Sequence, residues 1–289
     1  MGEGPATGLL AAGERVLLID AKDRRYLLTL VGGASFHTHA GIVAHDEIID
    51  RPEGSRVTGS TGRHFLVLRP TLADVVLKMP RGAQVIYPKD LGAILLAADI
   101  APGQRVLEAG VGSGALSMTV LRAGAAVLGY ELREDFASRA KSNVAAVLGP
   151  DVDYRVEIRD ITEGIEAEGL DRILLDLPEP WAVVGHAARA LRPGGIFLAY
   201  LPTINQTAHL RGALDQGPFA LAETVEILRR TWHVEPRSVR PDHRMVAHTG
   251  FLTTARRVVD GPAARAQRQD PTDPTDADDG SDQMDATST

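Results

Sequence analysis

Three glycines at alternate positions mark the stretch of the sequence best suited to bind a ligand, Val106-Leu-Glu-Ala-Gly-Val-Gly-Ser-Gly-Ala115. An apolar run leads into Gly110, Gly112 and Gly114, and a helical pattern follows. Glycine lets the backbone turn sharply and lets a ligand approach where no Cβ is in the way. Glu108 lies just before the turn, and its carboxylate would repel a phosphate. The stretch therefore favours a neutral or cationic nucleoside over a dinucleotide pyrophosphate.

Acidic residues end each of the next three predicted strands. Glu131 ends the second strand, Arg159-Asp160 follows the third, and Asp176 opens the turn Asp176-Leu-Pro-Glu-Pro-Trp181 after the fourth. Ligands of an open parallel sheet bind at the carboxyl ends of its strands, so we expect these groups to converge. Glu131 suits a ribose diol, and Asp160 suits the exocyclic amine of adenine. With Glu108 and Asp176 beside a cationic amino-acid portion and the reacting centre, the set favours S-adenosylmethionine.

Other interpretations of these residues remain open. The spacing Gly110-x-Gly112-x-x-Ala115, with Glu131 downstream, also satisfies the dinucleotide fingerprint, which makes an NAD-dependent oxidoreductase the alternative. A lone acid after a strand is often only a helix N-cap. Trp181 could stack on a base or pack in the core. A zinc site at His37, His39 and His45 competes with a structural or RNA-facing loop.

The spacing of apolar residues and turn residues predicts an α/β fold with two domains. After a flexible N-terminus (1–12), short strands over 15–19, 25–30, 56–58 and 64–68 and a His-rich loop over 36–46 indicate a small β-barrel-like domain (13–80). Alternating strands and helices then indicate a Rossmann-like domain (81–260), a parallel sheet with an antiparallel edge. The predicted strands are 105–108, 126–131, 154–158, 172–176, 196–201, 230–234 and 250–256, and the predicted helices are 90–100, 113–121, 134–148, 181–191, 205–214 and 221–229.

Composition limits the compartment and the class of protein. The 289 residues include no cysteine, which excludes disulfides and thiolate metal sites and favours the cytoplasm. No apolar run approaches the roughly 20 residues of a membrane span. The net charge of −7 comes from residues 270–289, which hold seven Asp and no Lys or Arg and lie in the predicted disordered acidic tail (261–289). The rest of the chain is neutral, so a nucleic-acid partner would need a local basic patch.

Several longer passages resemble the bacterial tRNA (adenine-N1)-methyltransferases that modify adenosine 58 of the T-loop. Asp176-Leu-Pro-Glu-Pro-Trp181 is similar to the Asp/Asn-Pro-Pro-aromatic element of enzymes that methylate base nitrogens. The other passages are Phe36-His-Thr-His, Leu68-Arg-Pro, Arg81-Gly-Ala-Gln-Val-Ile-Tyr-Pro-Lys-Asp90, Arg240-Pro and His248-Thr-Gly-Phe-Leu-Thr-Thr-Ala-Arg256. Together they span about residues 13–257. A methyltransferase acting on a substrate other than tRNA is the remaining alternative.

The resemblance implies a role for many single residues, together with S-adenosylmethionine as cofactor, tRNA as partner and a homotetramer. It places Asp176 at the catalytic centre, with Tyr87 and Tyr200 near the target base. The residues that match the cofactor pocket are Gln84, Glu108, Gly110, Gly112, Ser113, Gly114, Ala115, Leu116, Glu131, Phe136, Arg159, Asp160 and Asp176. The candidate phosphate contacts, taken from charge alone, are Arg24, Arg25, Arg81, Lys89, Arg229, Arg230, Arg240 and Arg244.

Overall fold

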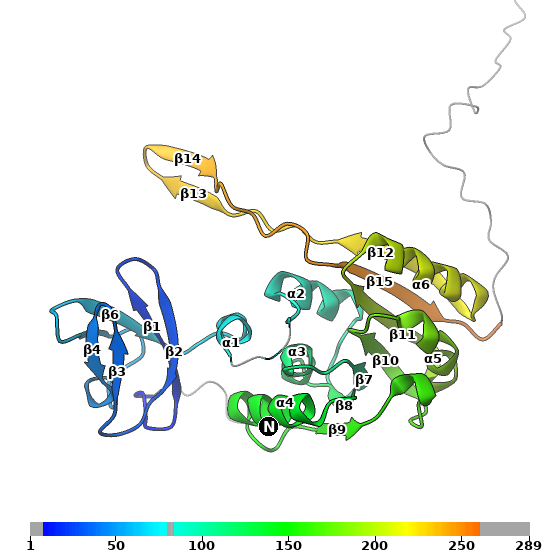
Figure 1. The fold of residues 1–289 in the computed structure, drawn as a ribbon, viewed down its shortest axis with the longest axis horizontal. Coiled ribbons are helices and arrows are strands. Elements are labelled where there is room, and N and C mark those ends of the chain that lie inside the picture. Colours follow the sequence, from blue (N-terminus) through cyan, green and yellow to red (C-terminus); the bar gives the residue numbers. More distant parts are fainter. Residues whose placement is uncertain (1–7, 80–81, 83, 261–289) are drawn as a thin grey trace, which may run out of the picture.

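A seven-stranded sheet forms the centre of the computed structural model, which describes residues 8–79, 82 and 84–260 (Figure 1). Its strand order is β12-β15-β11-β10-β7-β8-β9. β7 to β11 run parallel, and β15 runs antiparallel to both β11 and β12. The strands are β7 (Arg105–Ala109), β8 (Ala126–Glu131), β9 (Tyr154–Ile158), β10 (Leu170–Leu175), β11 (Leu191–Leu201), β12 (Phe219–Glu226) and β15 (Phe251–Arg257).

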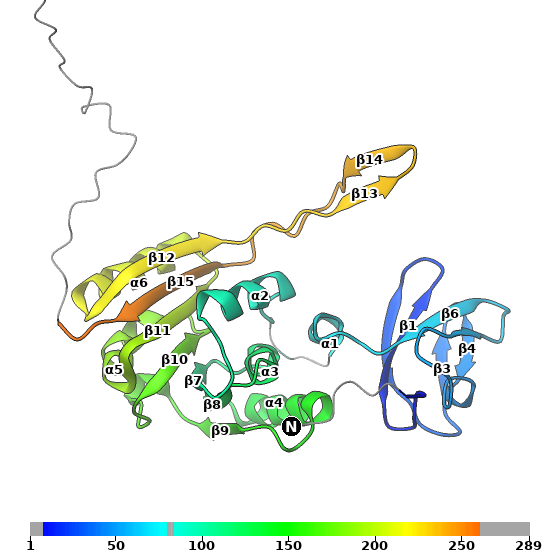
Figure 2. The same cartoon turned by 180° about the vertical axis from the view of Figure 1, so that it is seen from behind.

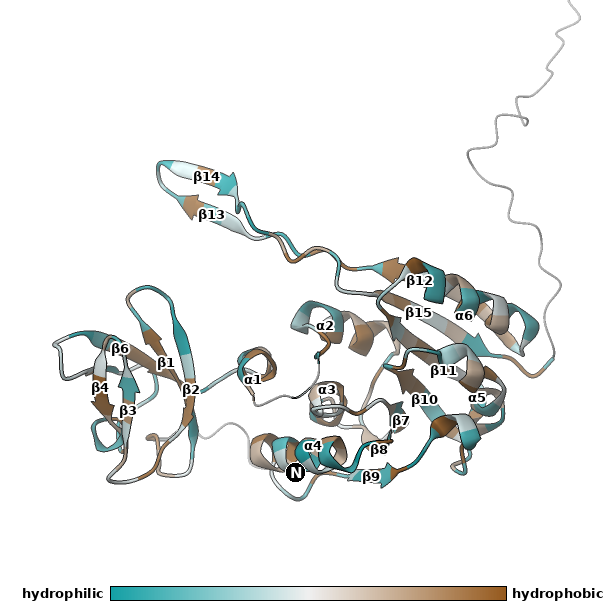
Figure 3. Ribbon diagram, viewed as in Figure 1, coloured by the Kyte–Doolittle hydropathy of each residue, from teal (hydrophilic) through white to brown (hydrophobic). Residues whose placement is uncertain are grey.

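Helices cover both faces of this sheet, as its near-continuous apolar strands require (Figures 1 and 3). One face packs against α1 (Leu72–Lys78), α2 (Pro88–Ala97), α3 (Ala115–Arg122) and α4 (Glu134–Leu148). The other face packs against α5 (Val184–Ala190), α6 (Ile204–Gln216) and the 3-10 helix η3 (Pro180–Val183). β8 and β9 lie on one side of β7, and β10 lies on the other. The order in which the chain adds strands to the sheet thus reverses between β7 and β10, and such folds bind ligands at this point.

A second, smaller core lies in the N-terminal part of the chain. The four strands β1 (Arg15–Asp20), β2 (Arg25–Thr29), β5 (Arg56–Thr58) and β6 (His64–Leu68) form a sheet in the order β2-β1-β6-β5. The region predicted as a His-rich loop is instead the hairpin β3 (Ser35–Thr38) and β4 (Gly41–Ala44), followed by the 3-10 helix η1 (His45–Glu47). The loop prediction was wrong because Phe36 and Val43, which pair across the hairpin, pack onto the small core.

The helix α1 connects the two parts of the chain. Thr71 and Asp74 form a reciprocal capping box at its N-terminus, which the sequence reading missed. Val75 and Val76 of α1 belong to the core of the large sheet. Asp74 also forms an ion pair with Arg25 of β2, with 3.2 Å between the nitrogen and the oxygen. The boundary predicted at residue 80 stays a prediction, and the acidic tail lies outside the described residues.

The segment after α6 departs most from the predictions. Residues 221–229, predicted as a helix, lie largely in strand β12, which pairs with β15. Residues 230–234, predicted to finish the large sheet, lie in a separate hairpin of β13 (Trp232–Glu235) and β14 (Ser238–Pro241). With its extended flanks this hairpin forms an arm, residues 227–249, that projects from the body of the molecule (Figures 1 and 2).

The predicted fold class is confirmed by the large sheet and the small N-terminal sheet. The ranges of β8, α4 and β9 agree with the prediction at both ends, and β15 pairs antiparallel at the predicted edge. Over the part of the chain that the structure describes, no helix is both long and apolar enough to cross a membrane.

Candidate active site

The glycine loop joins β7 to α3 and is held closely against the next strand. Gly110 has φ +82°, and a Cβ at this position would lie 2.1 Å from the backbone oxygen of Asp176. The Asp176 N–H in turn donates to the Ala109 carbonyl at 2.9 Å. A side chain at Gly110 would therefore both strain the backbone and displace Asp176. The loop and the Asp176 turn form one unit at the carboxyl ends of β7 and β10.

Glu131 anchors the other side of the loop. Its carboxylate accepts hydrogen bonds from the Gly112 N–H at 3.0 Å and the Arg133 N–H at 3.1 Å. Gly114 caps α3 in the left-handed conformation and packs on Ala140 of α4. The glycine loop is thus held at both ends.

Three carboxyl groups meet here, and within the described residues none of them forms an ion pair. Burial raises the pKa of Glu108 to about 8; donation from the Ser117 hydroxyl opposes this rise, and the charges of Asp176 and Glu131 add to it. Burial, with the Glu131 charge, also raises the pKa of Asp176 to about 7. A cationic ligand would give this cluster an ion-pair partner.

Glu108 belongs to a chain of hydroxyl groups that the sequence reading missed. Ser117 Oγ donates to Glu108 Oε2 at 2.6 Å and lies 3.0 Å from the Tyr154 hydroxyl. Burial raises the pKa of Tyr154, so this phenol stays protonated. Ser117 follows Gly114 by three residues on the first turn of α3, a spacing that could have indicated the contact. These hydroxyl contacts direct the Glu108 carboxyl group toward α3, beneath the glycine loop.

The cofactor fits an unsatisfied part of this site. Ser113 is only 4% exposed, and its Oγ has no hydrogen-bond partner among the described residues. A buried hydroxyl without a partner is costly unless a ligand satisfies it. S-Adenosylmethionine offers a carboxylate for this hydroxyl and two cations, a sulfonium and an ammonium, for the acids. The pyrophosphate of NAD offers only negative charge, which argues against the dinucleotide alternative.

Several other residues predicted to contact the cofactor have partners within the protein. Asp160 caps the 3-10 helix η2 (Ile161–Glu163) by accepting from Thr162 N at 2.8 Å. Arg159 pairs with Glu166 and lies 5.5 Å from the centre of the Tyr130 ring. The Arg133 guanidinium stacks 3.9 Å from the centre of the Phe136 ring. Ala115 and Leu116 are buried at the start of α3, and Gln84 is exposed.

The second half of the site is held by contacts between distant parts of the chain. Lys89 Nζ donates to Asp90 Oδ1 at 2.8 Å, to Thr249 Oγ1 at 2.6 Å and to the Ile227 carbonyl at 2.6 Å. Thr249 Oγ1 donates to Asp90 Oδ2 at 2.7 Å. The Asp90 side chain is fully buried and that of Lys89 is 4% exposed. Lys89 is therefore a buried structural cation, and its prediction as a phosphate contact was wrong.

This network borders the two tyrosines predicted near the target base. Gly250 follows Thr249, and a Cβ on it would lie 2.5 Å from the Tyr200 ring. Burial raises the pKa of Tyr200 to about 12, and the charges of Asp90 and Asp176 contribute to the rise. Tyr87 precedes α2 as its N-cap and is partly exposed. Tyr87, Tyr200 and Asp176 thus share one electrostatic environment.

His248 fastens the same segment to the large sheet. Its Nδ1 lies 2.6 Å from Glu226 Oε1, and its Nε2 lies 2.8 Å from the Pro202 carbonyl. Both partners are acceptors, so this arrangement favours the charged imidazole, which donates from both nitrogens. The hydrogen bond to Glu226 accordingly raises the pKa of His248.

The remaining candidates are Trp181, the histidines considered as a metal site and the arginines predicted to contact phosphate. Trp181 packs edge-on against His209 of α6, 5.3 Å between ring centres, and joins the core there. His45 is buried and accepts from the Val31 N–H at 2.9 Å. Among residues 8–79, 82 and 84–260, no group of three His, Asp or Glu could hold a metal ion. Arg81 lies outside the described residues, and Arg229, Arg230, Arg240 and Arg244 are exposed on the arm.

Comparisons with known proteins agree with this geometry. Residues 63–243 match the family described as the GCD14 subunit of the tRNA methyltransferase complex, and residues 8–57 match the TrmI-like N-terminal family. The tRNA (adenine(58)-N(1))-methyltransferase TrmI of Thermus thermophilus is 38% identical, over 84% of this chain and 96% of that protein.

Two crystal structures have the same fold. A structure from Thermotoga maritima, titled a SAM-dependent O-methyltransferase, is 35% identical with a TM-score of 0.85, over 89% of this chain and 97% of that one. The tRNA (m1A58) methyltransferase TrmI of Aquifex aeolicus is 30% identical with a TM-score of 0.77, over 86% and 99%.

Proposed function

The chain belongs to the TrmI-type family of tRNA (adenine-58-N1)-methyltransferases, and from this we infer that it transfers the methyl group of S-adenosylmethionine to N1 of adenosine 58 in the tRNA T-loop. The observation that carries this function is the cluster of Glu108, Glu131 and Asp176, which has no ion-pair partner among the described residues. The cluster lies at the reversal point of the sheet, and a cationic cofactor complements it. When bound, the cofactor supplies an electrophilic methyl group.

We propose that Asp176 holds the target base through its N6 amine. Adenine N1 has an in-plane lone pair, so no strong base is needed before it attacks the methyl carbon. Positive charge then develops on the ring, and a carboxylate that accepts from N6 stabilises this charge as it grows. Asp176 is partly exposed at the strand end, and Tyr87 and Tyr200 lie in the same electrostatic environment. The target base must leave the folded T-loop, and tyrosine stacking suits a base that has been flipped out.

Methyl transfer onto an unmodified tRNA transcript tests the function. Digestion and mass spectrometry of the nucleosides should find N1-methyladenosine, and a transcript in which adenosine 58 is replaced by guanosine should yield none. An O-methylated product would instead match the reaction named for the Thermotoga structure. The absence of any methylated adenosine would refute the assignment.

The substitution Asp176→Asn tests the proposed role of the carboxylate. The amide has nearly the same size but carries no charge, so turnover should fall by about 100-fold or more. The affinity for S-adenosylhomocysteine, measured by calorimetry, should weaken by less than about tenfold. Turnover near the wild-type rate would contradict the role.

We further propose a homotetramer in the cytoplasm. Two-stranded hairpins are rarely stable alone, yet the arm exposes apolar side chains on both strands, including Trp232, Val234 and Val239 at 57%, 70% and 67%. Exposed apolar residues of this kind favour burial against a partner, and we propose that the partner is another subunit. Light scattering should give four times the 30.9 kDa chain mass, and a monomer would contradict the proposal.

A further inference from the structure

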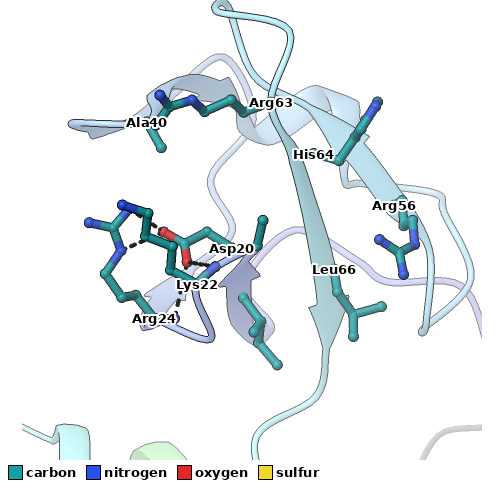
Figure 4. A pocket seen from close by; sticks show the side chains of 10 residues that line it. Asp20, Lys22, Arg24, Ala40, Arg56, Arg63, His64 and Leu66 are labelled. Carbon is teal, nitrogen blue, oxygen red and sulfur yellow. Dashed lines mark hydrogen bonds and ion pairs between the residues drawn. The ribbon is translucent and has the colours of Figure 1, made fainter.

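A basic pocket opens on the small N-terminal sheet, in a region to which the proposed reaction assigns no role. The cavity has a volume of about 570 Å³. Ile19 of β1 and Leu66 of β6 contribute apolar surface to it, and its polar rim comes from the β1–β2 turn, β5 and β6 (Figure 4). The rim residues are Asp20, Lys22, Arg24, Arg56, Arg63 and His64.

Most of the positive charge in this pocket is not neutralised. Asp20 is the only acidic residue that lines it, and its carboxylate pairs with Arg24 at 2.7 Å. Lys22, Arg56 and Arg63 form no ion pair within the described part of the chain. Three cations therefore surround an apolar floor, and they favour the binding of an anion.

The strand register places three of the lining residues on the face of the small sheet that lies away from its core. Ile19 pairs with Leu66, and Leu66 pairs with Arg56, so the three side chains lie on the same face of the sheet. Ile19 also pairs with Arg25, which reaches Asp74 in α1. This face therefore looks toward α1, while the opposite face packs on the small apolar core. A large substrate bound at the carboxyl ends of the big sheet could extend toward the pocket.

We propose that the pocket is a second contact site for tRNA, which binds the sugar-phosphate backbone away from the target adenosine. This inference rests on the proposed function. Arginine guanidinium groups bind phosphate oxygens in a bidentate way, and Ile19 and Leu66 offer apolar contact to a ribose. The rim presents cations and one neutralised acid, so the contact positions the RNA without reading its sequence. Such a contact strengthens substrate binding and leaves the chemical step unchanged.

The test compares two double variants of the full chain. Arg56→Ala/Arg63→Ala removes two pocket cations. Arg51→Ala/Arg155→Ala removes two exposed cations elsewhere, each paired with a glutamate in the wild type. The affinity for an unmodified tRNA transcript is measured by fluorescence anisotropy between 50 and 300 mM salt. Steady-state methylation and S-adenosylhomocysteine binding are measured in parallel.

The pocket variant should bind tRNA roughly tenfold more weakly near 0.15 M salt, and its log-log salt slope should fall by about 1.4 to 1.8, because each phosphate contact contributes about 0.7 to 0.9. Its KM for tRNA should rise by the same factor, while kcat and cofactor affinity stay at the wild-type values. Equal losses in both variants would overturn the proposal, as would an unchanged slope. A lower molecular mass of the pocket variant would instead assign this face to self-association. Failure of the wild type to form N1-methyladenosine would refute the proposed function alone, since tRNA binding is measured separately.

Discussion

Cofactor binding should release protons from the carboxyl cluster, and this prediction follows directly from the buried acids. With pKa values of about 8 and about 7, Glu108 and Asp176 are largely and half protonated in the free protein at pH 7. A cationic ligand favours the ionised form of both. The protons must therefore leave as S-adenosylmethionine binds, and affinity should rise with pH until both groups are ionised.

The size of the release can be worked out. An opposite charge within about 4–6 Å lowers a carboxyl pKa by about 1–3 units. A drop of about 2 units takes Glu108 from roughly 0.9 to roughly 0.1 proton at pH 7, and takes Asp176 from roughly 0.5 to nearly zero. The pair, which titrates as a coupled system, should release about 1.3 protons.

Calorimetric titration at pH 7 in buffers of different ionisation enthalpy measures this number. Glu108→Gln should remove about 0.8 of a proton from the release and Asp176→Asn about 0.5, because each deletes one titrating group. Glu163→Gln, at an exposed position in η2, is the matched control and should change nothing. The ligand's own ammonium contributes equally in every variant and cancels in the differences. A wild-type release below about 0.3, or no change in Glu108→Gln, would refute the electrostatic account of the site.

Two substitutions test the half of the site that holds the tyrosines. Lys89→Met leaves the fully buried Asp90 carboxylate without its cation, and breaking a buried pair in this way should lower the free energy of unfolding by about 3–5 kcal/mol in urea denaturation. Gly250→Ala places a Cβ 2.5 Å from the Tyr200 ring, so methylation should fall strongly, while unfolding stability drops by only about 1–3 kcal/mol.

Each of these variants has a control in the same chain. Lys141→Met changes an exposed lysine of α4 and should alter stability by less than about 0.5 kcal/mol. Gly92→Ala adds a Cβ on α2 where no atom lies within 4 Å, and it should stabilise slightly. Similar stabilities for Lys89→Met and its control would show that the network is not a buried ion pair. Wild-type activity in Gly250→Ala would show that the position of Tyr200 does not affect the reaction.

The large sheet could be predicted from sequence because its signals are local. The apolar run that ends at Glu131 sets the bounds of β8, the amphipathic pattern before Gly149 sets those of α4, and the alternating residues before Asp160 set those of β9. The prediction failed at β12, where Ala220 to Glu226 mix small, apolar and acidic residues in a way that also suits a helix. Leu221 there has φ +54° at a break in the pairing with β15, so tertiary pairing decides the structure. A strand that depends on a partner about 30 residues away has no local signature.

The candidate site divides in the same way. The glycine loop and the acids after the strands follow from position along each strand, since parallel strands carry their carboxyl ends to one edge. The contact of Lys89 with Thr249 joins residues 160 positions apart. Both lie in passages that mark the family resemblance, but nothing in the spacing shows that the two passages touch, and charge alone misassigned Lys89 to the surface.

The two halves of the site differ in how many of their polar groups find hydrogen-bond or ion-pair partners within the protein. Around Tyr200, the Lys89, Asp90 and Thr249 side chains bond to one another, and His248 uses both ring nitrogens. Around the glycine loop, Ser113 Oγ has no hydrogen-bond partner and the carboxyl cluster has no ion-pair partner among the described residues. Unsatisfied groups persist in native structures where function requires them. We therefore expect the half around Tyr200 to orient the target base and the half around the glycine loop to gain binding energy from the cationic cofactor.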